Sequence, residues 1–211
     1  MLAVLLGTRL AVAVLSGPHL VATTYRLWLL RADIDRRVLL RFGFASAAGG
    51  LAGAVVGTFL SSPVLSVVLG ALLILGGTLE LTGIGRRMVI GDRVAVSAGA
   101  VSGFFGGLVG NQGGIRAAAL LRFDLPGPAL VATSTATALL VDVARVPVYV
   151  ATKWNDLLAN LPLIGVLTAG VLAGTIFGAP ILRRLPEAVF RRVLAVLLIG
   201  LGILLVVGVR Q

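Results

Sequence analysis

The chain contains no cysteine and only one histidine in 211 residues. The lack of cysteine excludes disulfide bonds, thiolate metal sites and cysteine nucleophiles, and one histidine cannot build a multi-histidine metal centre. Charge is also scarce: 12% of the residues are charged, against about 25% in soluble domains, while 58% are hydrophobic. A water-soluble core of this size cannot bury so much apolar surface. The composition therefore predicts an all-α integral membrane protein.

The net charge of +10 is not gathered into one basic face. Lys and Arg stand in short clusters between apolar runs, which is the pattern that orients helical membrane proteins in anionic lipid. We therefore expect the lipid bilayer as a partner, and not nucleic acid. The expected location is the bacterial plasma membrane, as a multi-pass protein. The first apolar stretch lacks the basic region of a signal peptide and carries Arg9, so we interpret it as a mature helix.

Apolar stretches of about 20 residues, the length that crosses a bilayer, predict about six transmembrane helices. They lie near residues 2–21, 38–60, 63–84, 128–150, 157–180 and 187–208. A seventh apolar region, 94–121, differs because six glycines crowd its middle. Each glycine costs about 1 kcal/mol relative to alanine in a helix. This region is therefore predicted to be a broken segment.

One sequence pattern occurs twice, 121 residues apart. Residues 51–57 read Leu-Ala-Gly-Ala-Val-Val-Gly, and residues 172–178 read Leu-Ala-Gly-Thr-Ile-Phe-Gly. The match predicts a first repeat over 1–84, a linker over 85–93 and a second repeat over 94–211. The alternative is chance similarity, because runs of small residues are common in membrane helices.

The placement of Lys and Arg predicts how region 94–121 lies in the membrane, because cytoplasmic loops are rich in these residues. Outside the apolar segments there are 15 of the 18 Lys and Arg. A full crossing gives ten on the cytoplasmic side and five outside, whereas a re-entrant segment gives 13 and two. We therefore predict a re-entrant segment. Each repeat then crosses three times, and an odd number of crossings inverts the second copy relative to the first.

The broken segment carries most of the candidates for binding a substrate. Its glycines permit backbone conformations that turn N–H groups towards an anion, and two amide side chains add donors. An arginine follows at the start of the returning half-helix, where the helix dipole also favours an anion. The alternative is that the glycines only let helices pack closely. The candidates are Gly110, Asn111, Gln112, Gly113, Gly114 and Arg116.

The next predicted helix adds further polar candidates. Asp142 and Arg145 lie three residues apart on one helix face, where they can pair, and charges at this depth are expected to face the bundle interior or water. A structural ion pair and a role in substrate binding are both open. Thr133 and Ser134 can bond to a substrate or to carbonyls of their own helix. His19, near the end of the first predicted helix, indicates an interfacial or hydrogen-bonded residue, with a proton shuttle as the alternative.

Catalysis has no positive support in the sequence. No Ser-His-Asp set can be assembled at one depth, no Gly-x-x-x-x-Gly-Lys phosphate loop occurs, and no pair of carboxylates stands out. We therefore expect no enzymatic activity, no metal site and no cofactor.

The glycine-rich break, the following Ala132-Thr133-Ser134 and the two-repeat layout resemble the sulfite exporter TauE/SafE family of membrane permeases. In that family each half opens with a broken segment of the form Gly-x-x-Gly-x-Gly-Gly-Gly, followed by an apolar helix entered through Ala/Gly-Thr-Ser. The resemblance covers about 95–208 and the first half from its second element onward. Gly110, Gly113 and Gly114 match the break, and Thr133 and Ser134 match the helix entry.

This resemblance implies transport of a small anion, with a sulfur oxyanion or a sulfonate as the substrate. A secondary mechanism is expected, since the sequence contains no nucleotide-binding motif. The counterpart of 94–121 is absent before residue 1, which indicates a start further upstream or a shortened paralogue. The alternative function is therefore a non-transporting membrane subunit, or a truncated paralogue, that needs a partner. A homo-oligomer is compatible with either function.

Overall fold

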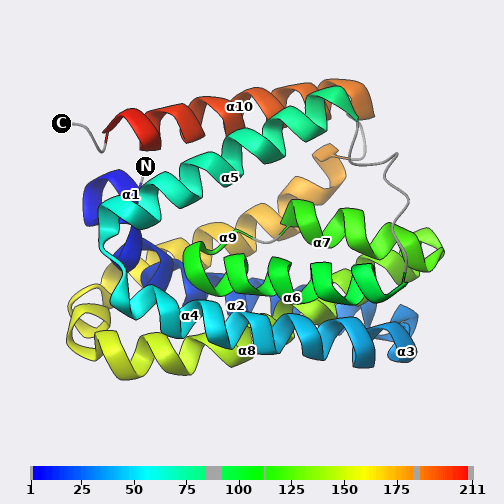
Figure 1. The fold of residues 1–211 in the computed structure, drawn as a ribbon, viewed down its shortest axis with the longest axis horizontal. Helices are drawn as coiled ribbons and strands as arrows, with labels where there is room; N and C mark the ends of the chain where they lie inside the picture. The colour runs from blue at the N-terminus through cyan, green and yellow to red at the C-terminus, as the bar shows by residue number, and fades with distance from the viewer. Residues whose placement is uncertain (1, 84–91, 112, 183–185, 209–211) are drawn as a thin grey trace.

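The computed structural model describes residues 2–83, 92–111, 113–182 and 186–208, and the regular elements among them are all helices (Figure 1). The long helices are α2 (Thr8–Leu30), α4 (Phe44–Phe59), α5 (Ser62–Thr82), α6 (Asp92–Val109), α8 (Gly127–Ala159), α9 (Leu161–Leu182) and α10 (Glu187–Gly208). Shorter elements join them: α1 (Leu2–Leu6), η1 (Arg31–Asp33), α3 (Arg36–Val38), η2 (Leu39–Gly43), α7 (Gly113–Leu120) and η4 (Leu121–Phe123).

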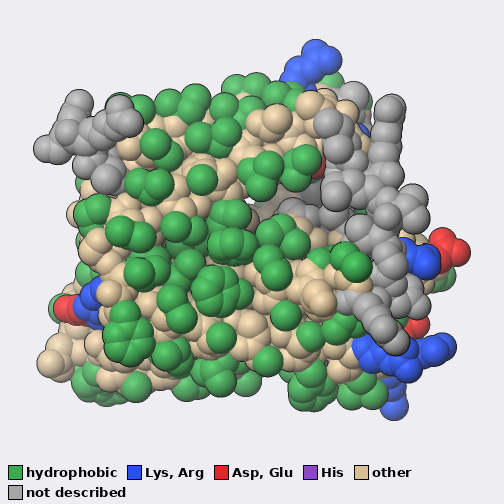
Figure 2. All heavy atoms as spheres, viewed as in Figure 1, with side chains coloured by type: hydrophobic (Ala, Val, Ile, Leu, Met, Phe, Trp, Pro, Cys, Tyr) green, Lys and Arg blue, Asp and Glu red, His purple; other side chains and the backbone are tan. Residues whose placement is uncertain are grey.

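Five of the described helices are long and apolar enough to cross a membrane: α4 with the turns before it, α5, α8, α9 and α10. The 23 residues of α2 are also enough to span a bilayer, although this helix carries Arg9, His19 and Arg26. A broad hydrophobic surface covers the middle of the molecule, and most of the Lys and Arg in view lie at one end (Figure 2). The predicted multi-pass helical membrane fold is confirmed.

Region 94–121 is broken, as predicted. Gly110 has a φ of 77°, a left-handed conformation that glycine adopts without steric cost, and it ends α6 before α7 begins. The start of α6 and the end of α7 lie at the same end of the molecule, which is also the end where α10 starts (Figure 1). This arrangement agrees with a re-entrant segment.

The predicted helix over 2–21 is wrong at both ends. Gly7, with a φ of 76°, separates α1 from α2, and α2 continues to Leu30. The continuation passes Arg26, whose long side chain can carry its charge into an aqueous cavity while the helix goes on. His19 consequently lies at the middle of α2, and not near its end.

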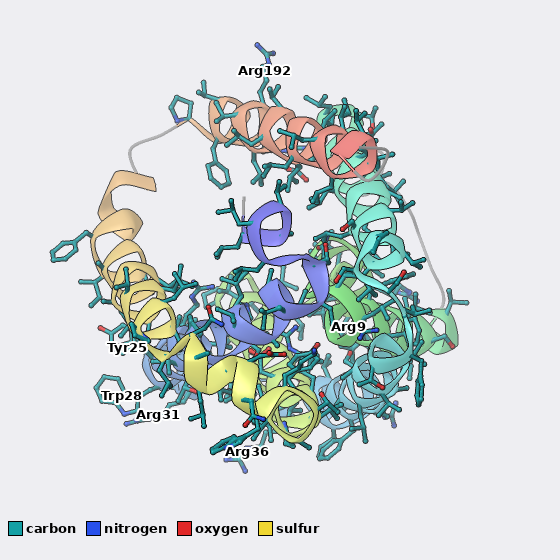
Figure 3. The ribbon with its side chains drawn as sticks, turned by 90° about the vertical axis from the view of Figure 1, so that its left-hand side faces the viewer. Arg9, Tyr25, Trp28, Arg31, Arg36 and Arg192 are labelled. Carbon is teal, nitrogen blue, oxygen red and sulfur yellow. The ribbon has the colours of Figure 1, made fainter. Side chains whose placement is uncertain are left out.

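Two arginines near the opposite ends of α2 point in different directions. Arg9 lies among the surrounding helices and donates a hydrogen bond to the carbonyl of Leu60, between α4 and α5 (Figure 3). Trp28 and Arg31, at the other end, point outward, and Arg31 stacks over the Trp28 ring (Figure 3). Arg9 is therefore held inside the bundle through its Nη2, while its Nε is buried without a hydrogen-bond partner among the described residues, and Arg31 belongs to the charged end of the molecule.

Helices α4 and α6 cross at a contact made of glycines. A Cβ atom at Gly49 or Gly53 would lie 2.0 or 1.9 Å from a carbonyl oxygen of α6, and one at Gly103 or Gly107 would lie 1.8 or 1.9 Å from a carbonyl oxygen of α4. No side chain fits at such distances, so these four glycines set how closely the two backbones approach. For Gly103 and Gly107, the close-packing interpretation is confirmed.

Helix α9 matches α4 in sequence but has different surroundings. In the repeat pattern Gly53 corresponds to Gly174, yet a Cβ atom at Gly174 would meet no described atom within 4 Å. The apolar stretch Leu161–Gly178 of α9 is not buried within the molecule. The two copies thus share a pattern without sharing a packing environment, and the division of the chain into two repeats stays a prediction.

Candidate anion-binding site

A buried carboxylate on α8 connects α2 to α8. Asp142 is fully buried, and Arg145 donates from Nε to its Oδ1 at 2.9 Å, with Nη2 at 2.7 Å from the same oxygen. On the other oxygen, Oδ2 lies 2.6 Å from Nδ1 of His19 on α2. A carboxylate paired with arginine only accepts hydrogen bonds, so Nδ1 of His19 carries the proton. The predicted ion pair and the hydrogen-bonded interpretation of His19 are both confirmed.

Two side chains of α8 also bind the end of α6. Arg145 donates from Nη1 to the carbonyl of Gly106 at 2.6 Å, and the hydroxyl of Tyr149 donates to the carbonyl of Gly107. The last carbonyls of a helix have no partner within it, and a cation is favoured at this negative end of the helix dipole. Arg145 and Tyr149 therefore fix the bend at Gly110.

Arg116, in the first turn of α7, faces α8 as well. Its Nε donates to Oγ of Ser134 at 3.1 Å, whereas its Nη1 is buried and has no hydrogen-bond partner among the described residues. A buried donor without a partner is costly, and more so when it is charged. Asp142, Arg145 and Arg26 lie close enough to interact electrostatically with Arg116. Arg116 thus presents an unused donor in surroundings with two further cations and one anion.

Two cavities of similar size lie beside this cluster. One has a volume of about 670 Å³ and the other about 650 Å³. Along α2, the residues that line the first cavity run from Ala11 to His19, and those that line the second run from His19 to Arg26. The cavities therefore extend towards opposite ends of α2, and His19 lines both.

The structure brings half of the predicted site residues to these cavities. Gly110, Asn111 and Arg145 line the first cavity, and Arg116 and Ser134 line the second. Arg116 and Ser134 belong to different helices, and the structure brings these two predicted residues together in one cavity. Their direct hydrogen bond was not anticipated.

The remaining predicted residues are placed differently. Thr133 is fully buried, and its hydroxyl accepts a hydrogen bond at 3.0 Å from the backbone N–H of Asp35. Gly113 and Gly114 form the first turn of α7. Gln112 lies outside the described residues. Asp142 contributes through its bonds to other side chains and is not among the residues that line the two cavities.

Sequence reasoning missed several polar residues of the site. Thr23 and Glu80 line the second cavity, and Oγ1 of Thr23 lies 3.4 Å from Nδ1 of His19. Glu80 pairs with Arg191 at 2.6 Å. The helical period could have indicated Thr23, because Thr23 and His19 are four residues apart and share a face of α2.

Comparison with known proteins supplies the family. A family model described as Sulfite exporter TauE/SafE matches residues 1–205, which include the first predicted repeat, the second up to residue 205 and every residue of the cluster. No match was found among curated proteins or among solved structures. Members of this family are transporters, and not enzymes. With its helical membrane fold and a match over nearly its whole length, the chain belongs to the sulfite exporter TauE/SafE family of membrane permeases.

Proposed function

We propose that the protein is a secondary permease that carries a small oxyanion, of the sulfite or sulfonate class, across the bacterial plasma membrane. The supporting observation is the buried Nη1 of Arg116, which has no partner among the described residues, on a side chain that lines a cavity of about 650 Å³. The bond from Nε to Ser134 holds the guanidinium plane in place. A planar guanidinium suits an oxyanion because it can donate two hydrogen bonds at once.

The charges near the cavity favour an anion. The carboxylate of Asp142 is paired with Arg145 at 2.7 Å, and that of Glu80 is paired with Arg191 at 2.6 Å. The charge of Arg116 is not matched by a carboxylate in direct contact among the described residues. An anion that enters would therefore gain a charge-assisted contact to Arg116.

The two cavities support a transport role, because a secondary permease must expose one site to each side of the membrane in turn. The cavities extend towards opposite ends of α2. His19 lines both of them, Arg145 lines the first and Arg116 lines the second. We place the arginine-rich end of the molecule in the cytoplasm, as the positive-inside rule predicts.

Flux of radiolabelled sulfite from proteoliposomes tests this proposal. The wild-type protein should release sulfite faster than protein-free liposomes do. Arg116→Gln should lower flux at low sulfite by roughly 10- to 150-fold, which is the loss of about 1.5–3 kcal/mol for a hydrogen bond to a charged group. Arg116→Lys should recover only part of the flux, because a point charge lacks the planar fork.

The matched control is Arg192→Gln, which removes the same charge from an exposed side chain at the surface of α10 (Figure 3). It should leave the flux unchanged. All variants are compared per molecule of monodisperse protein, so that misfolding is not counted as lost transport. Normal flux in well-folded Arg116→Gln would refute the assignment of Arg116 to the site.

A further inference from the structure

We propose that His19, held by Asp142 and Arg145, is a proton-binding site that couples passage of the anion to a proton moving in the same direction. The inference rests on the proposed function, because coupling requires a transported anion. It assigns a role to a residue that the anion site itself does not use.

The position of His19 is the first observation. His19 lies at the middle of α2 and lines both cavities, which extend towards opposite ends of that helix. Its side chain is 49% exposed, whereas the Asp142 side chain that it contacts is 0% exposed. A proton can therefore reach the imidazole from either cavity, while the carboxylate holds the ring in place.

The hydrogen bond to Asp142 determines which ring nitrogen can titrate. Nδ1 already carries a proton and donates it to Oδ2 at 2.6 Å, so the lone pair of the neutral ring is on Nε2. A hydronium ion from one cavity forms an N–H bond at Nε2, leaves water behind and creates an imidazolium beside the carboxylate. Breaking the same N–H bond returns the proton to water in the other cavity. Imidazole is also the side chain whose charge changes in the physiological pH range.

The charged groups around His19 determine what accompanies the proton. Asp142 and Arg145 cancel each other, so protonation of His19 adds a positive charge to a site where Arg116 already supplies one. Helix α9, which packs on α2, contributes no charge, because residues 161–182 contain no titratable side chain. The charged groups around His19 are Asp142, which contacts it, and Arg145, which is paired with Asp142, both on α8. Arg116 on α7, Glu80 on α5 and Arg26 on α2 line the second cavity together with His19.

Proton and anion consequently favour each other's binding. The imidazolium attracts the anion, and by thermodynamic reciprocity the bound anion favours the imidazolium. An anion accompanied by a proton also carries one unit less of uncompensated charge through the middle of the membrane, where charge is most costly. Both reasons predict that proton and anion occupy the site together and move in the same direction.

The test compares two transport modes in proteoliposomes. His19→Gln keeps a hydrogen-bond donor for Asp142 but cannot be protonated. Exchange of radiolabelled sulfite at equal concentrations needs no net proton movement, whereas uphill accumulation does. With the membrane potential clamped at zero, a pH gradient of one unit should raise wild-type accumulation on the alkaline side about tenfold for one proton per anion. The variant should keep exchange within about threefold of wild type and lose the accumulation that exceeds the redistribution caused by sulfite's own protonation.

Sulfite changes its own protonation in this pH range, so the proteins are compared at the same pair of pH values, where that contribution is identical. The control is Thr24→Val on the same helix, because Thr24 is exposed and its hydroxyl bonds to the carbonyl of Leu20 in its own helix. It should keep both modes. Accumulation by His19→Gln equal to wild type would overturn the proposal, and so would an equal loss of exchange and accumulation, the outcome that a purely structural role predicts. No exchange in the wild type would overturn the proposed function, and the coupling with it.

A second measurement does not depend on flux. His19 is the single histidine of the chain, so isotope-labelled histidine gives one imidazole whose titration can be followed by NMR in detergent. Saturating sulfite should move the titration midpoint of wild-type protein to higher pH, since the bound anion favours the imidazolium. Arg116→Gln should abolish that shift. A wild-type midpoint that sulfite leaves unchanged, in protein that exchanges sulfite, would overturn the coupling and leave the proposed function standing.

Discussion

Replacing Gly53 by alanine should force α4 away from α6. A Cβ atom at this position would lie 1.9 Å from the carbonyl oxygen of Phe104 and 2.8 Å from its carbonyl carbon. Real Cβ atoms stay at least 3.0 Å from such neighbours, so the helices must separate by about 1 Å. The obstacle is backbone, which cannot move aside by changing rotamer.

The expected loss of stability follows from two opposed terms. Overpacking costs about 1–3 kcal/mol, and the upper part of that range applies where the contact is with backbone. The better helix propensity of alanine offsets about 1 kcal/mol of this. Gly53→Ala should therefore lower the free energy of unfolding by about 2 kcal/mol. The measurement is a titration of mixed micelles with sodium dodecyl sulfate, followed by helical circular dichroism.

Gly174→Ala is the matched control, because Gly174 occupies the equivalent place in the repeat pattern with no described atom within 4 Å of its Cβ position. It should leave the stability unchanged or raise it by up to about 1 kcal/mol. The leucine variants at the two positions should widen the difference. Equal destabilisation at Gly53 and Gly174 would refute the reasoning, since it would show that α9 is packed at this face as tightly as α4 is.

Three further measurements test the cluster and the topology. Arg145→Gln removes the charged partner of the buried Asp142 carboxylate and should lower the free energy of unfolding by about 3–5 kcal/mol in the same titration. Adding Asp142→Asn should recover part of this loss. A double variant no more stable than the single variant would contradict the ion pair between Asp142 and Arg145. Tyr149→Phe removes a hydroxyl bonded to the end of α6 and should cost about 1 kcal/mol, so an unchanged stability would show that this bond is not formed. Single cysteines at Arg36 and Arg122 should react with an impermeant maleimide from the same side of the membrane, and reaction from opposite sides would exclude the re-entrant segment.

The fold class could be predicted from the sequence, whereas the extent of α2 could not. Long apolar runs have essentially one stable form in a bilayer, because a helix satisfies every backbone polar group internally. Hydropathy alone, however, predicts that the span ends before the charged Arg26. In the structure Arg26 lines a cavity while the helix continues to Leu30, so its charge is accommodated by the tertiary structure.

The candidate site was predictable where its residues share one helix. Asp142 and Arg145 are three residues apart, and the helical period alone indicates that they can pair. The bonds from His19 to Asp142 and from Arg116 to Ser134 join residues that are 123 and 18 positions apart. They depend on how one helix is rotated and shifted against another, which a hydrophobic period does not specify.

The glycine-rich run shows why pattern alone could not choose between packing and binding. Gly103 and Gly107 pack on α4, Gly106 offers its carbonyl to Arg145, and Gly110 bends the chain. Close packing at Gly103 and Gly107 and the left-handed bend at Gly110 both favour a residue without a side chain, so they leave the same pattern in the sequence, whereas any residue could offer the carbonyl of Gly106. Only the position of α4 and α8 beside the run separates them.

The hydrogen bonds of Arg145 favour Arg116 as the residue that contacts the anion. Arg145 donates to Asp142 and to the carbonyl of Gly106, so turning towards a substrate would leave a buried carboxylate or a helix end without its partner. Unpairing a buried carboxylate costs about 3–5 kcal/mol, which is more than a hydrogen bond to a charged group supplies. Nη1 of Arg116 has no partner in the part of the chain that the structure describes, and using it breaks none of the existing hydrogen bonds of Arg116. We therefore infer that Arg145 acts by holding the bend at Gly110, and that the substrate contact belongs to Arg116.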